Sequence, residues 1–169
     1  MLGSLAIINF VGAKNKFLDS RFLILLFFYH SFLAITYYVY AVYNPSDSLQ
    51  YFNNLSSNYR DGSWGDYFGT STDFIEFLAY PLIQWFDFSY ESCMMTFAFF
   101  GFFGFIYFYI FFRERIQYRP TLFGFDGIMI IFLLPNLHFW ASSLGKGSVI
   151  FLGFGLFFYS LKNPIRRLA

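Results

Sequence analysis

Apolar residues in this sequence are gathered into long runs that are separated by polar connections. The first run, Phe22–Tyr43, contains no charged residue. As a helix it would be about 33 Å long, enough to cross the roughly 30 Å hydrocarbon core of a bilayer. Tyrosines crowd its carboxyl end, as is typical where a helix leaves the bilayer, and Asn44-Pro45 ends it. The pattern predicts a transmembrane helix.

Three further runs are predicted to span the membrane, over residues 92–112, 122–140 and 147–161. The apolar part of the third, Leu122–Leu134, would be only about 20 Å long as a helix, and the fourth about 22 Å. Both are short for a span, so the polar sequence between them is expected to lie against protein or a water-filled cavity. Short or broken apolar segments of this kind indicate a site within a membrane fold.

A polar connection over residues 44–91 separates the first two spans and carries most of the acidic residues. Seven of the ten are here, opposed by Arg60 alone: Asp47, Asp61, Asp66, Asp73, Glu76, Asp87 and Glu91. Within the connection, Asp73–Phe88 is too short and too charged to span. It is predicted to be an amphipathic helix on the outer membrane face, kinked at Pro81, with Asp73 and Glu76 near its start.

The basic residues predict the orientation. If the N-terminus is cytoplasmic, four spans place only Arg60 and Lys146 outside. The inner side then receives Lys14, Lys16, Arg21, Arg113, Arg115, Arg119, Lys162, Arg166 and Arg167. Because cytoplasmic loops are enriched in Lys and Arg, both termini are expected to be cytoplasmic. The expected fold is an all-α membrane bundle of four spans plus an interfacial helix, forming a single domain over residues 1–169.

Composition supports a membrane protein and excludes several other classes. Only 12% of the residues are charged, against about 25% in soluble domains. The net charge of +1 gives no indication of nucleic-acid binding. Cys93 is the only cysteine, and His30 and His138 lie on different segments, so neither a metal site nor a cofactor is expected. His30 is expected to hydrogen-bond a neighbouring helix, with a proton relay as the alternative.

Asp47 and Lys146 are the candidate functional residues. Asp47 follows the first span, where a partly desolvated carboxylate would serve as a general base; the alternative is a turn residue after Pro45. Lys146 lies between two glycines at a predicted helix start, a pattern that favours binding of a phosphate. The alternative is a lysine that extends to water from the membrane surface. His138 and Arg60 are expected to join the phosphate site. The alternative for His138 is an interfacial anchor together with Trp140.

Several stretches resemble bacterial envelope polysaccharide synthesis proteins. They are LPNLHFWASSLGKGS at Leu134–Ser148, DSLQYF from Asp47, Gly69-Thr70 and Pro81-Leu82. The sequence is similar to the exopolysaccharide and O-antigen polymerase families and, more loosely, to C-type glycosyltransferases. The resemblance implies a polyprenyl-phosphate-linked sugar as substrate, an outer-face site in the bacterial inner membrane, Asp47 as its acidic residue, and Lys146 with Arg60 at the lipid phosphate.

Those families have more spans than the four expected here. The chain is therefore expected to be an N-terminal portion or a small relative that works with other membrane subunits. Two other functions remain open at this stage. One is a module that binds or transports an anionic lipid or solute. The other is a structural subunit that packs against a larger membrane complex through its Phe-rich faces, with Gly101 and Gly104 as sites of close helix packing.

Overall fold

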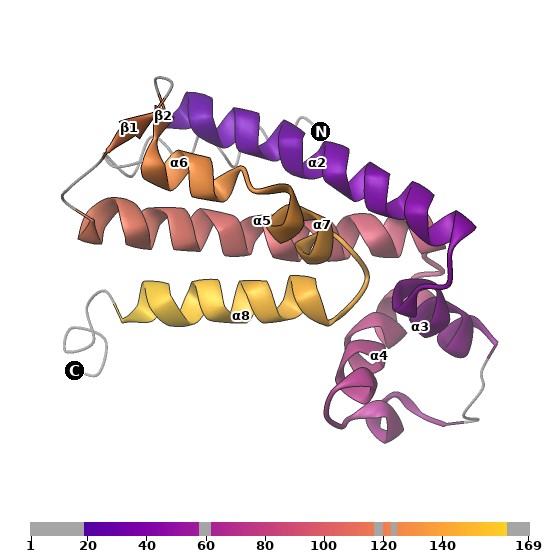
Figure 1. Ribbon diagram of the computed structural model, residues 1–169. Coiled ribbons are helices and arrows are strands. Elements are labelled where there is room, and N and C mark those ends of the chain that lie inside the picture. Colours follow the sequence, from indigo (N-terminus) through magenta and orange to yellow (C-terminus); the bar gives the residue numbers. More distant parts are fainter. Residues whose placement is uncertain (1–18, 58–61, 117–119, 123–124, 162–169) are drawn as a thin grey trace.

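The computed structural model describes residues 19–57, 62–116, 120–122 and 125–161, and this part of the chain is almost entirely helical (Figure 1). The α-helices are α2 (Ser20–Tyr43), α3 (Asp47–Ser56), α4 (Thr72–Tyr80), α5 (Tyr90–Arg115), α6 (Gly127–Phe132), α7 (Pro135–Ala141) and α8 (Lys146–Ser160). A 3₁₀ turn (Trp64–Tyr67), a π-helical turn (Pro81–Trp85) and a hairpin of β1 (Thr121–Leu122) with β2 (Phe125–Asp126) complete the order. The expected all-α class is confirmed.

Helices α2 and α5 are each long and apolar enough to cross a membrane, at 24 and 26 residues. Each starts at a side-chain cap: Asp19 accepts the N–H groups of Arg21 and Phe22, and Ser89 accepts that of Ser92. Such caps satisfy N–H groups that have no partner inside the helix. These helices coincide with the first and second predicted spans.

The third predicted span, over residues 122–140, is not a single helix, and four spans are not confirmed. The segment starts in the β1–β2 hairpin and then forms α6 and α7, which are interrupted at Leu133 and Leu134. Leu134 is extended, with φ −66° and ψ 121°, because the ring of Pro135 disfavours helical conformation in the preceding residue. Helices α7 and α8 meet at 108°, so together they form at most one broken span or a re-entrant loop.

The connection between α2 and α5 is more helical than its composition indicated. It contains α3, which the apolar pattern does not indicate, and α4, which runs into the π-helical turn at Pro81. The helix expected near Asp73–Phe88, with its irregularity at Pro81, is therefore present. In Figure 1, α3 and α4 lie at one end of the long helices, opposite the start of α2 and the end of α8.

Three glycines allow α5 to approach α7 and α8 closely. A Cβ atom at Gly101 would overlap the carbonyl oxygen of Ala141 in α7. At Gly104 it would lie 2.8 Å from the carbonyl carbon of Phe151 in α8, and at Gly155 it would lie 2.7 Å from the carbonyl oxygen of Gly104. The close packing expected at Gly101 and Gly104 is thus confirmed, and its partners are α7 and α8.

The core consists of two clusters along the bundle. One joins α2, α5, α6 and α7 through Phe22, Leu26, Phe105, Tyr109 and Phe132, among others. The second joins the other halves of α2 and α5 to the α3–α4 layer and contains Tyr37, Tyr51, Ile75, Phe97 and Leu144, among others. The α3–α4 layer is therefore anchored to the bundle by buried side chains.

We predict that Gly101→Ala lowers stability by about 1–3 kcal/mol, because the added methyl group meets a backbone carbonyl that cannot move aside alone. Gly153→Ala is the matched control, since a Cβ atom there has no neighbour within 4 Å. Thermal unfolding of the purified protein in detergent measures both variants. An equal effect at the two positions would contradict the close approach of α5 and α7.

Candidate functional site

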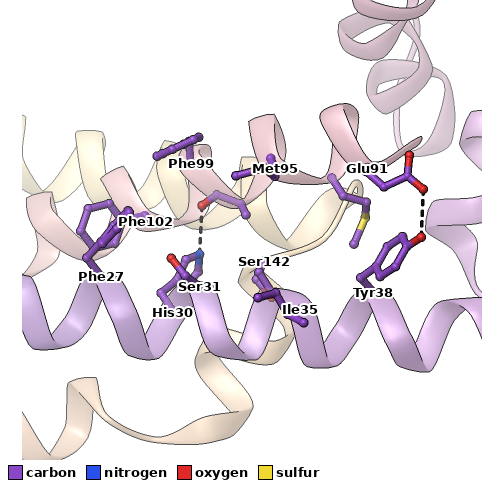
Figure 2. Close-up of a pocket in the computed structure, with 13 residues that line it drawn as sticks. Phe27, His30, Ser31, Ile35, Tyr38, Glu91, Met95, Phe99, Phe102 and Ser142 are labelled. Carbon is purple, nitrogen blue, oxygen red and sulfur yellow. Dashed lines mark hydrogen bonds between the residues drawn. The ribbon is translucent and has the colours of Figure 1, made fainter. Parts of the chain in front are cut away.

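A groove lies between α2 and α5 and encloses a volume of about 300 Å³. Figure 2 shows Phe27, Ile35, Met95, Phe99 and Phe102 projecting along it from the two helices. The lining is predominantly apolar, so the groove suits an apolar ligand better than a polar one.

The groove follows from the spacing of small residues on two helices. Ser31 and Ala34 of α2 line it together with Ala98 of α5. Because residues three or four apart share a helix face, short side chains at these positions leave space where larger ones would fill the gap. The groove therefore exists because the side chains at Ser31, Ala34 and Ala98 are small.

One end of the groove is polar. The hydroxyl of Tyr38 donates a hydrogen bond of 2.9 Å to Oε1 of Glu91, as Figure 2 shows. The adjacent Tyr90 hydroxyl lies 2.8 Å from that of Ser48 in α3. The first contact joins α2 to α5, and the second joins α5 to α3. The groove is therefore polar at the end where an amphipathic ligand would place its polar group.

Along the groove wall, His30 pairs with His138 of α7. Their Nδ1 atoms are 2.8 Å apart, and both side chains are buried. His30 Nε2 lies 2.9 Å from the carbonyl oxygen of Ala98, and His138 Nε2 lies 2.6 Å from that of Phe132. The expected hydrogen bond from His30 to a neighbouring helix is confirmed. Both ring nitrogens of His138 have partners in the core, so the structure does not bring His138 to Lys146.

Lys146 is the first residue of α8 and is half-buried. The loop before it is held by protein groups: the Leu144 N–H donates to Sδ of Met94 at 3.2 Å, and the Ser148 hydroxyl lies 2.9 Å from the carbonyl oxygens of Ser143 and Gly145. A Cβ atom at Gly145 would lie 4.0 Å from the ring of Tyr51 in α3. Lys146 therefore lies at the end of the bundle that carries α3.

Asp47 is at this same end, as the first residue of α3. It is exposed and lies on a shallow hollow lined by Pro45, Ser46, Gln50 and other residues of that turn. The Ser46 hydroxyl caps the helix by accepting the N–H of Leu49. Within the described part of the chain, Asp47 and Lys146 share an end of the bundle but form no ion pair with each other. Arg60 falls outside the described residues.

Two polar features were not recognised from the sequence. Glu76, which was expected near the start of a surface helix, is buried and accepts a 2.8 Å hydrogen bond from Asn54 of α3. The sequence does place Glu76 next to Ile75 and three residues before Ala79, both apolar. This spacing puts Glu76 on the buried face of α4 and could have indicated its burial. Asp126, placed inside a predicted span, instead caps α6 and forms an ion pair with Arg113.

Among the described residues, no group of three or more His, Cys, Asp or Glu side chains is arranged to hold a metal ion. Comparison of the chain with protein-family models, curated proteins and solved structures gave no match. The groove, the histidine pair and the polar end of the bundle are therefore the features that indicate a function.

We predict that Asn54→Ala destabilises the protein by about 1–3 kcal/mol, because it removes a hydrogen-bond donor from the buried carboxylate of Glu76. Asn53→Ala is the matched control, since the neighbouring Asn53 side chain is exposed. Denaturant unfolding followed by tryptophan fluorescence compares the two. Equal stabilities would show that the Asn54–Glu76 hydrogen bond contributes nothing.

Proposed function

We propose that this protein is an integral membrane protein whose α2–α5 groove holds the apolar chain of a lipid. We further propose that it acts in cell-envelope polysaccharide synthesis on a polyprenyl-phosphate-linked sugar at the outer face of the bacterial inner membrane. The observation that carries the first proposal is the apolar groove between two helices of membrane-crossing length. The sequence resemblance supports the second.

The position of the groove favours a lipid as the occupant. Ile35 and Met95, on its two walls, are each 64% exposed. In a bilayer such side chains face acyl chains, so a lipid tail reaches the groove without passing through water. Flexible, unbranched or lightly branched hydrocarbon matches a long apolar groove better than a compact solute does.

Chemistry on the carrier would use the polar end of the bundle. The ammonium group of Lys146 and the backbone N–H groups at the start of α8 form a suitable partner for the lipid phosphate. The carboxylate of Asp47 would accept a proton from the attacking sugar hydroxyl, while the cation stabilises charge that develops on the departing diphosphate. Asp47 begins α3 and Lys146 begins α8, near the end of the bundle that carries α3.

The exposure of Asp47, away from direct contact with Lys146, favours a second candidate function. In this alternative the chain binds or transports the lipid-linked substrate, alone or with other membrane subunits, and bond formation takes place elsewhere. The two functions share the groove and Lys146, and they differ in the role of Asp47.

We predict that Ala34→Phe blocks lipid binding, because the new ring would occupy space in the groove that Ala34 lines. Val39→Phe is the matched control, since Val39 is on the same helix, is 48% exposed and does not line the groove. The protein is reconstituted in phospholipid vesicles with a polyprenyl phosphate that carries a photoreactive diazirine on its chain. Crosslinking of this lipid to the protein should fall by more than half in Ala34→Phe and stay unchanged in Val39→Phe. Undiminished labelling would contradict the groove assignment.

We predict that Lys146→Ala weakens binding of the phosphate-bearing carrier and that Asp47→Asn abolishes polymer formation while leaving carrier binding intact. The loss of a general base typically costs about 10²–10⁴-fold in rate. Incorporation of labelled sugar into polymer by membranes that contain the full chain measures the reaction, and vesicle binding measures affinity. Normal polymer formation by Asp47→Asn would reject catalysis and favour the binding or transport function.

A further inference from the structure

The contacts of the His30–His138 pair require more protons than two neutral rings carry. A carbonyl oxygen only accepts hydrogen bonds, so the two Nε2 atoms that face the carbonyls of Ala98 and Phe132 must both be protonated. The Nδ1 atoms then face each other at 2.8 Å. Without a proton between them, two lone pairs would point at one another at hydrogen-bond distance.

Three hydrogen bonds therefore need three protons on four ring nitrogens, whereas two neutral imidazoles carry two. Satisfying all three contacts would take one proton beyond the neutral count, which would lie between the Nδ1 atoms and give the pair a net charge of +1. This count follows from the positions of the acceptors.

The surroundings offset part of the cost of a buried charge. Burial in an apolar core disfavours charge, but here the charge is delocalised over two rings whose outer nitrogens both donate to carbonyls. The ring of Phe105 stacks on His138 with centroids 4.0 Å apart and planes within 5°, and aromatic faces attract cations.

The titratable groups around the pair are few. Tyr29 of α2 contacts His138 edge-on, with ring centroids 5.0 Å apart. Glu91 of α5 and Tyr38 of α2 line the same groove as His30 and are hydrogen-bonded to each other. From α6 the pair receives only the carbonyl of Phe132, and Phe105 of α5 contributes a ring. Among the described residues no carboxylate forms an ion pair with either histidine.

We propose that His30 and His138 form a buried proton-binding site in the centre of the helical bundle. The site takes one proton from hydronium, which leaves as water, and holds it between the two Nδ1 atoms. Release of that proton returns both rings to neutrality and removes the His30–His138 hydrogen bond between α2 and α7. Because His30 also lines the groove, the proton links the α2–α7 contact to the groove wall.

The number of protonated ring nitrogens tests this site directly. Full-length protein with ¹⁵N-labelled histidine, reconstituted in lipid nanodiscs at neutral pH, should give three protonated ring nitrogens and a scalar coupling between the two Nδ1 atoms. Two protonated nitrogens and no such coupling would overturn the proposal. The measurement needs no variant, so it does not depend on a substituted protein folding.

His138→Gln provides the second test. An amide in place of the ring cannot share the extra proton, so the remaining His30 should be a neutral ring with one proton on Nε2, bonded to Ala98. Tyr29→Phe is the matched control, since it alters the neighbouring titratable group and should leave all three protonated nitrogens in place. A His30 ring that remains doubly protonated in His138→Gln would show that the pair does not share the proton.

Discussion

The structure depends on the close approach of backbones at Gly101, Gly104 and Gly155. Their missing side chains allow α7 and α8 to pack directly on α5, and α5 packs more extensively on α8 than on α2. Two consequences follow. Helix α7 is held deep enough for His138 to reach His30, and α2, without glycine contacts of this kind to α5, is separated from it by a groove. The histidine pair and the groove thus share one packing origin.

The parts of the fold that could be predicted from the sequence are those that a count of apolar residues determines. Helices α2 and α5 belong to this class, because a long uncharged run has few alternatives to a buried or membrane-crossing helix. The segment over residues 122–140 does not, since its structure depends on the conformation that Pro135 imposes on Leu134 and on the Asp126–Arg113 ion pair. Helix α3 escaped prediction because its polar residues outweigh the few apolar ones that pack inward.

Some features of the candidate site could likewise be predicted from the sequence, and others could not. The placement of Asp47 and Lys146 at one end of the bundle follows from the order of apolar and polar segments, which fixes the end that each connection reaches. The pairing of His138 with His30 could not be predicted, since these residues are 108 positions apart and meet only through the packing of α7 on α5. Burial of Glu76 likewise depends on α3, whose Asn54 supplies its hydrogen bond.

The brevity of α6 and α7, which precede the 108° bend into α8, has a consequence for what holds them in place. Neither α6 nor α7, at six and seven residues, is long enough to partition into a bilayer by itself during synthesis. Each needs a protein surface to satisfy the backbone groups left at its ends. In a bilayer, α6 and α7 would therefore rely on the surface that α2 and α5 provide, against which they pack.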